Sequence, residues 1–395
     1  MPDISVIVPS YNHSQFVGEA ISSVLNQTHR PAEVIIIDDA SSDASLQEIE
    51  KFRGNPSVKI IPSNENLGGA ESLNRGIGHS TGELIAICNS DDIWESDKLE
   101  RQLNAFTPDI GAVFTDVRWI GKFGEELKGG SPFSSVFSQQ NRSRGEWLRD
   151  LIEGGNCLCH PSVLIRREVY DKVGPYDNRM RQLPDYKMWL NVLQHTEINV
   201  LADKLIRFRL HDNTSKPSYS TSIRDRNEFA DIALDFFSNL SEANFIRAFG
   251  SKKAPYDTNF NLNIEKAIYL WTNSKLETRI SYWIANTLVL EILSSEAGVN
   301  CWKRYGLSMR DFHNLRGLKS PWLDLGEQTF FSISELETLQ RLGMETSQNF
   351  GVEAETTMTR DHRPTSASRY RIYMRACWRY PLNLKKRSRY IADRM

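Results

Sequence analysis

Leu84-Ile-Ala-Ile-Cys-Asn-Ser-Asp-Asp92 is the stretch that decides the fold, because a short apolar run passes directly into polar and acidic residues. An apolar run of this length predicts a buried strand of a parallel sheet. Ligands of open α/β sheets bind at the carboxyl ends of the strands, where Asp91 and Asp92 would lie. Carboxylates at that edge suit a divalent cation and a phosphate-bearing ligand. A strand followed by an Asp that caps a helix would give the same pattern.

The same arrangement occurs upstream, where the apolar run Val34–Ile37 passes into Asp38 and Asp39. Strand and helix patterns alternate through this region, with strands expected at 4–9, 34–37, 58–61 and 84–88 and helices at 17–24, 44–52 and 69–77. Such alternation implies right-handed crossovers. We therefore expect an α/β fold whose mostly parallel sheet has flanking helices and carries both acidic pairs at one edge.

Five stretches resemble the family 2 glycosyltransferases, which have the nucleotide-sugar-binding GT-A fold. They are Ser5–Asn12, Ser23–Thr28, Ile36–Asp43, Asn66–Gly76 and Thr81–Asp92, in the order in which the family has them. With the later segments, the resemblance covers residues 1–215. It implies a GT-A (Rossmann-like) sheet and an enzyme that uses a nucleotide-sugar donor.

The resemblance assigns donor contacts to residues of several loops: Pro9, Tyr11, Asp38, Asp39, Asn66, Gly68, Asn74 and Arg75. Asp39 would accept a hydrogen bond from a ring N–H of the nucleobase, and Asp38 would support that loop. Gly68 would let the backbone approach a ligand that a Cβ would exclude. The alternative for this glycine-rich stretch is a turn and the start of a helix.

The resemblance also implies a divalent metal, Mn²⁺ or Mg²⁺, with Asp91 as its direct ligand. Asn89 stands where the family usually has an Asp, so it could offer only an uncharged carbonyl oxygen. Asp92 would lie behind the ligand or cap a helix that we expect near Glu95. His211 could ligate the metal or donate to a phosphate oxygen, and Arg209 could neutralise the diphosphate.

A second family segment runs from His160 to Leu190 and contains the candidate general base, Asp185. The family has an acidic dipeptide at the start of an aromatic-rich helix, and here Pro184 replaces its first residue. Proline suits the first turn of a helix, since the missing N–H would have no partner there. The alternative is that Asp185 only complements the helix dipole.

Together these residues predict an inverting glycosyltransferase. It would move a sugar from a nucleotide-diphosphate donor, in our expectation a UDP-sugar, to a hydroxyl of a glycan or lipid-linked acceptor in bacterial surface polysaccharide synthesis. One alternative is a nucleotide-sugar-binding module without turnover, which Asn89 and Pro184 make conceivable. Another is a sugar nucleotidyltransferase, although its glycine-rich signature is missing after Pro9.

Length and composition favour more than one domain, because 395 residues exceed the usual size of a single domain. We expect a GT-A glycosyltransferase domain at 1–220, a helical accessory domain at 224–344, a mobile linker at 345–368 and a basic tail at 369–395. The five cysteines form no paired framework, which favours a reduced cytoplasm. We expect no leader peptide, and the most apolar later stretch, 282–293, is too short to span a bilayer.

The overall charge of −2 hides an asymmetry, since residues 360–395 carry +9 and the remainder −11. Tyr370, Tyr373, Met374 and Cys377 would share one side of a basic amphipathic helix. That pattern is typical of a segment that lies on an anionic membrane, and a solvated tail or a helix docked on the acidic body are the alternatives. The protein would then be cytoplasmic and peripheral on the inner face of the membrane. We expect no nucleic-acid partner, because no RNA- or DNA-binding module accompanies the charge.

Overall fold

The computed structural model describes residues 2–127, 135–211, 219–253, 257, 260–318, 328–331, 338, 351–353 and 370–373. The chain divides into two compact units, residues 1–252 and 253–395, each of which is described by itself. This division lies later than the boundary that composition suggested. Helices α8 (Tyr219–Asn239) and α9 (Glu242–Phe249) therefore belong to the first unit.

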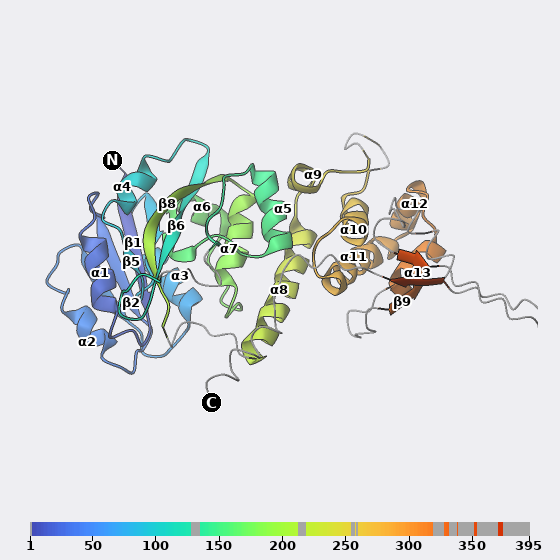
Figure 1. The fold of residues 1–395 in the computed structure, drawn as a ribbon. Helices are drawn as coiled ribbons and strands as arrows, with labels where there is room; N and C mark the ends of the chain where they lie inside the picture. Colours follow the sequence, from blue (N-terminus) through green and yellow to red (C-terminus); the bar gives the residue numbers. More distant parts are fainter. Residues whose placement is uncertain are drawn as a thin grey trace, which may run out of the picture. The chain divides into compact units, whose positions relative to one another are not determined.

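Over the described residues, the first unit is built around an eight-stranded sheet in the order β3-β2-β1-β4-β7-β6-β8-β5 (Figure 1). Its strands are β1 Ile4–Ser10, β2 Glu33–Asp38, β3 Val58–Pro62, β4 Leu84–Ile87, β5 Ile93–Trp94, β6 Ile110–Ile120, β7 Leu164–Arg166 and β8 Glu197–Arg209. The half that contains β1 to β4 is parallel, whereas β7 pairs antiparallel with both β4 and β6. The α/β fold class is confirmed, and the departures from a parallel sheet lie in its second half.

The parallel half forms because its strands are apolar on both faces. Val6, Ile7 and Val8 of β1 have no exposed surface, and neither do the apolar residues of β2. Helix α1 (Val17–Leu25) contributes a buried stripe at helical spacing to this core. Helices α2 (Ser45–Glu50) and α3 (Gly69–His79) complete the predicted alternation.

The chain after β4 differs from the expectation in one respect. No helix begins at Glu95 in this described segment, because Ile93–Trp94 forms β5 and α4 begins at Lys98 (Lys98–Leu103). The main-chain N–H of Glu95 donates to the carbonyl of Leu205 at 3.1 Å, which ties it to β8. Asp92 therefore caps no helix.

Three further α-helices lie in the described chain between α4 and α8, and they contact one another and β7. They are α5 Arg144–Gly154, α6 Arg167–Val173 and α7 Pro184–Leu193, with a 3₁₀ turn at His160–Ser162. A reciprocal pair, Ser143 and Glu146, caps the start of α5. Pro184 occupies the first turn of α7, as expected from the sequence.

The described part of the second unit is largely helical. It contains α10 Leu262–Thr272, α11 Thr278–Leu293, α12 Glu296–Arg304 and α13 Met309–Leu318. Trp302 is fully buried and packs edge-on against Trp271 and Phe312, so this unit has its own core. The predicted helical C-terminal region is confirmed. Within the described residues, no helix is long and apolar enough to cross a bilayer.

A small antiparallel sheet follows, with β11 (Tyr370–Tyr373) between β10 (Gly351–Glu353) and β9 (Gln328–Phe331). Tyr370–Tyr373 is thus a strand, where we expected the start of a helix. It contains two Tyr and an Ile, which are residue types that favour strands. Met374, Cys377 and the rest of the predicted tail lie outside the described residues, as does most of the predicted linker.

Candidate active site

A cavity of about 580 Å³ lies at the carboxyl edge of the main sheet. Four of the predicted site residues line it, namely Pro9, Gly68, Asn89 and Asp185. They come from β1, the start of α3, the end of β4 and the start of α7. The volume is within the usual range for a small-molecule site. Residues predicted for the donor and for the acceptor side therefore share one cavity.

One wall of the cavity is aromatic, and the sequence analysis did not single it out. Trp119, Phe137 and Phe208 line it, with ring centroids 4.9 Å apart for Trp119 and Phe208 and 5.8 Å for Trp119 and Phe137. Trp119 and Phe208 are register partners on β6 and β8. Strand pairing brings Trp119 and Phe208 together, and Phe137 stacks on Trp119 from outside the strands, so the spacing of these residues along the chain carried no signal.

Asp39 holds the donor-side loop by accepting hydrogen bonds from the main-chain N–H groups of Leu67 (2.9 Å) and Gly68 (2.8 Å). Asn66 donates in turn to the main-chain oxygen of Asp39 at 3.2 Å. Gly68 has φ +93°, and a Cβ there would lie 2.8 Å from the guanidinium of Arg181. The positive φ favours glycine at this position, and a Cβ would also have to displace the flexible end of the Arg181 side chain. The contact of Asp39 with a nucleobase stays a prediction.

Two other residues predicted for the donor site, Tyr11 and Asp38, differ in their exposure to solvent. Tyr11 is 44% exposed at the end of β1, which leaves its ring accessible to a ligand. Asp38 is buried and accepts from the main-chain N–H of Ser41 at 3.1 Å, as expected for a loop support.

Asn74 and Arg75 make structural contacts. Asn74 exchanges two hydrogen bonds with the main chain of Tyr176, at 2.8 and 2.9 Å, and Arg75 donates to Ser63. Neither residue lines the cavity, and their contact with a nucleotide stays a prediction.

Asp91 lies between two histidines. Its Oδ2 is 3.0 Å from Nε2 of His211 and 4.0 Å from Nε2 of His13. These three residues offer ligand atoms that all lie within 4.8 Å of one another. Asp91 and His211 were predicted from the sequence motifs, whereas His13 was not, although it directly follows the motif that ends at Asn12.

The protonation state of His13 suits a metal ligand. Desolvation by burial lowers its pKa, and His211 adds to this, although Asp91 opposes the shift. A neutral imidazole is the form that binds metal. The two imidazoles suit a divalent transition ion better than Mg²⁺, which prefers oxygen ligands, and the carboxylate also suits Mn²⁺.

Asp92 faces the interior. Burial raises its pKa well above the usual value, and the neighbouring Asp91 adds to the shift. Its Oδ1 accepts from the main-chain N–H of Arg209 at 2.9 Å. Asp92 therefore supports the turn that carries Asp91 from its buried side.

Arg209 is almost fully buried, with 2% of its surface exposed. Its guanidinium donates to the main-chain oxygens of Asp91 (2.8 Å) and Lys122 (2.9 Å) and to Glu19 (2.7 Å). These contacts hold the turn that carries Asp91. A direct contact of Arg209 with the diphosphate stays a prediction.

Asp185 lies in the first turn of α7, and one oxygen accepts from the side-chain amide of Asn156 at 2.8 Å. Asn156 also lines the cavity, and so does His160. Desolvation lowers the pKa of His160, although Asp185 opposes the shift. Asp185 can therefore act as a base that an amide orients, next to an imidazole that favours its neutral form.

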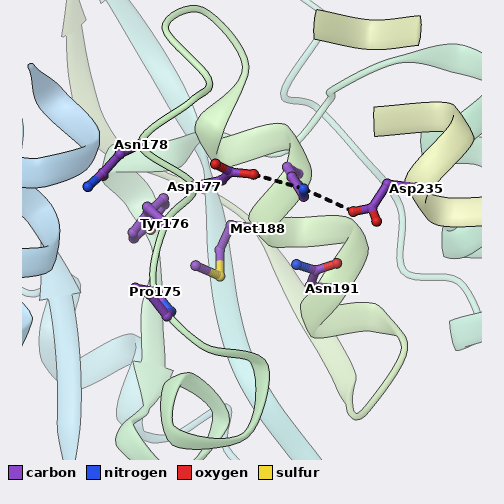
Figure 2. Close-up of a pocket in the computed structure, with 8 residues that line it drawn as sticks. Pro175, Tyr176, Asp177, Asn178, Met188, Asn191 and Asp235 are labelled. Atoms are coloured by element: carbon purple, nitrogen blue, oxygen red, sulfur yellow. Dashed lines mark hydrogen bonds and ion pairs between the residues drawn. The ribbon is translucent and has the colours of Figure 1, made fainter. Parts of the chain in front are cut away.

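A smaller cavity of about 410 Å³ is lined by residues 175–178 of the loop before α7 and by residues of α7 and α8. Figure 2 shows Asp177 and Asp235 facing each other across it, and Lys187 lies 2.9 Å from a carboxylate oxygen of each. Asn178 lines both cavities. The charges of this second cavity are thus paired within the protein.

Comparison with known proteins gave concordant results. The family model described as glycosyl transferase family 2 matches residues 5–174. An uncharacterized glycosyltransferase of Nostoc sp. is 30% identical over 247 residues, which are 58% of this chain and 72% of that protein. The putative teichuronic acid biosynthesis glycosyltransferase TuaG of Bacillus subtilis is 31% identical over 197 residues, 49% of this chain and 73% of that protein.

Solved structures agree on the fold. Residues 1–349 of S. aureus TarS in complex with UDP-GlcNAc superpose with a TM-score of 0.52 at 16% identity, covering 89% of this chain and 95% of that one. The complex with UDP gives a TM-score of 0.50, covering 80% of this chain and 90% of that one. At this identity the likeness concerns the fold alone.

Proposed function

The chain belongs to glycosyltransferase family 2, and from this premise we propose that it is an inverting enzyme of surface polysaccharide synthesis. It moves a sugar from a nucleoside-diphosphate donor, in our expectation a UDP-sugar, to a hydroxyl of a glycan or lipid-linked acceptor. The relative named for teichuronic acid biosynthesis and the neighbour that binds UDP-GlcNAc support this choice of acceptor and donor. The observation that carries the proposal is the single cavity shared by Gly68, Asn89 and Asp185.

In the proposed reaction, Asp185 takes the proton from the acceptor hydroxyl as its oxygen attacks the anomeric carbon. The bond from that carbon to the diphosphate breaks, and the nucleoside diphosphate leaves from the opposite face. Asn156 supports this role because its amide fixes one oxygen of Asp185 at 2.8 Å. A single displacement inverts the configuration and needs no nucleophile from the protein.

Asp91, His211 and His13 would hold the divalent ion. When bound, Mn²⁺ would neutralise the charge that develops on the leaving diphosphate. Asp92 and Arg209 support this site by fixing the turn of Asp91. Asn89 adds no charge, so we expect weaker metal binding than an Asp at this position would give.

The test uses the purified full chain with Mn²⁺ and a panel of UDP-, GDP- and dTDP-sugars. Nucleoside diphosphate release is measured with and without glycan acceptors, and the anomeric configuration of the product is determined by NMR. Release from one donor that an acceptor stimulates, with inversion, is the expected result. Binding of donors without any release would favour the binding-module alternative, and formation of a nucleotide sugar from sugar phosphate would favour the nucleotidyltransferase.

We also propose that the basic segment 369–395 brings the enzyme to the cytoplasmic face of an anionic membrane. Its charge supports this, since each Lys or Arg near an anionic surface contributes about 1 kcal/mol. A variant that ends at Glu345 should lose liposome binding at low salt and keep donor binding. Equal sedimentation of both proteins with anionic liposomes would reject the membrane role.

A further inference from the structure

A diphosphate in the cavity needs a neighbouring cation, and Arg209 is the residue that the family resemblance assigns to that charge. Its donors contact main-chain oxygens and Glu19, and it does not line the cavity. Among the described residues that line the cavity, Arg181 is the only Arg or Lys. The sequence analysis assigned it no role.

Arg181 reaches the donor side of the cavity. Its Nη1 lies 2.8 Å from the point that a Cβ of Gly68 would occupy, so the guanidinium covers the backbone of that glycine. No hydrogen bond or ion pair joins this guanidinium to another residue of the described chain. A guanidinium that lines a cavity without a protein partner keeps its donors for a ligand.

The neighbouring cations differ from Arg181 in this respect. Arg179, two residues earlier, donates to both carboxylate oxygens of Asp177 at 2.8 and 2.7 Å. Lys187 lies 2.9 Å from a carboxylate oxygen of both Asp177 and Asp235. The acids of this region thus neutralise the cations around Arg181 and leave Arg181 itself unpaired.

Glu228 of α8 fixes the loop that carries Arg181. Its carboxylate accepts from the main-chain N–H groups of Arg181 (2.9 Å), Gln182 (2.8 Å) and Leu183 (2.9 Å), and the residue is only 7% exposed. Charge-assisted hydrogen bonds of this kind are stronger than neutral ones. The ring of Phe229 stacks on Tyr186 of α7 with centroids 6.0 Å apart, so α8 contacts both the loop and the helix that follows it.

We propose that Arg181 is an anion-binding residue of the cavity, which donates to phosphate oxygens of the ligand, and that Glu228 positions it. The proposal rests on the proposed function, since a nucleotide-sugar donor supplies such oxygens. The phosphate could belong to the donor diphosphate or to a phosphate-bearing acceptor. Direct binding measurements separate these sources and do not depend on turnover.

The experiment compares Arg181→Gln with the wild-type full chain by calorimetry in Mn²⁺ buffer, using uridine and UDP. We expect the affinity for UDP to fall roughly tenfold to a hundredfold, the usual value of a hydrogen bond to a charged group, while uridine binding is unchanged. Arg181→Lys, which keeps the charge, should restore part of the loss. Arg179→Gln is the matched control and should bind UDP as the wild type does.

Unchanged UDP affinity together with an increased KM for a phosphate-bearing acceptor, but not for a neutral one, would place the phosphate on the acceptor. If neither quantity changes, Arg181 does not bind an anion and the proposal is overturned. Glu228→Gln should weaken UDP binding in the same direction but less, with uridine binding kept, whereas Asp231→Asn on the exposed side of the same helix should have no effect. A wild-type protein that binds UDP through Arg181 yet transfers no sugar would reject the proposed function and retain this inference.

Discussion

The donor side and the acceptor side of the cavity are held together in different ways. On the donor side, residues at the ends of parallel strands bind the loops beside them, as when Asp39 at the end of β2 holds Leu67 and Gly68 after β3. On the acceptor side, Asp185 depends on Asn156 from another loop. The loop before Asp185 depends on Glu228 from α8, a helix beyond the sheet.

This difference indicates which part of the site can accept substitutions without loss of the fold. Sheet topology fixes the donor side, because parallel strands deliver their carboxyl ends to one edge whatever the loops contain. The acceptor side consists of loops and helix ends that side chains hold in place, and such parts tolerate change without loss of the scaffold. We therefore expect substitutions on the acceptor side to alter transfer and those on the donor side to alter donor or metal binding. Arg181 and its support Glu228 are the exception, because the Arg181 guanidinium reaches Gly68 on the donor side.

Asp185→Asn should have the largest effect on transfer. Asn keeps the shape and can still contact Asn156, but it cannot accept a proton, so transfer should fall by roughly 10²–10⁴-fold. Donor affinity should stay the same, because the diphosphate is held elsewhere. The measurements are transfer rate, UDP affinity and melting temperature on one preparation, with Asp171→Asn on the exposed face of α6 as the control. Near-normal turnover would leave Asp185 as a helix-terminal charge worth about 1 kcal/mol or less.

Asp91→Ala comes next and tests the other side. Removing the only carboxylate of the His-Asp-His set should weaken Mn²⁺ binding by roughly 10²-fold or more, since even the loss of a supporting residue costs about tenfold to a hundredfold. UDP affinity with Mn²⁺ should then equal the affinity with chelator. Asn89→Asp is the matched variant and should tighten the metal. A wild-type protein whose UDP affinity is the same in Mn²⁺ and in chelator would refute the metal site.

The sequence predicted the donor half of the fold well, because each signal there is local. An apolar run followed by an acid marks a buried strand and its end, and the structure places Asp38 at the end of β2 and Asp91 shortly after β4. The alternation of strands and helices was confirmed up to β4. A local motif also predicted that Asp185 opens a helix behind Pro184, and the structure places both residues in the first turn of α7, while the role of Asp185 as a base stays a prediction.

The rest depended on contacts that no spacing in the sequence reveals. Trp119 and Phe208 meet only because β6 pairs with β8. Glu228 is one acid among many on a long helix, and only the fold brings it to the N–H groups of residues 181–183. Arg209 matched the motif, but a motif cannot show that burial commits its donors to main-chain oxygens.

Asn156→Ala should have an intermediate effect on transfer. It removes the hydrogen bond that orients Asp185, so transfer should fall by about tenfold, corresponding to the loss of a hydrogen bond to a charged group. UDP affinity and the metal should not change. Asn141→Ala, which removes an amide that contacts β8 instead, controls for the loss of a structural amide. Equal transfer by the Asn156 variant and the wild type would show that Asp185 needs no such support.

Asp43→Asn should have the smallest effect, and it concerns the stability of the donor side alone. Burial opposes ionisation of Asp43, but hydrogen bonds from Ser45 and from the main chain of Ser14 outweigh it and lower its pKa to about 2. A carboxyl whose pKa is lower in the folded state stabilises the fold above the pKa of the unfolded chain. That stability is lost as the pH falls from about 4 towards 2. Because Asp43 is exposed, solvent screening limits its contribution to about 1 kcal/mol or less.

Urea denaturation at pH 7 and at pH 3 should show the Asp43→Asn variant less stable than the wild type at pH 7 and closer to it at pH 3. Glu65→Gln, in a nearby loop, is the control. A difference that does not shrink at low pH would mean that shape, and not charge, is what Asp43 contributes to this loop.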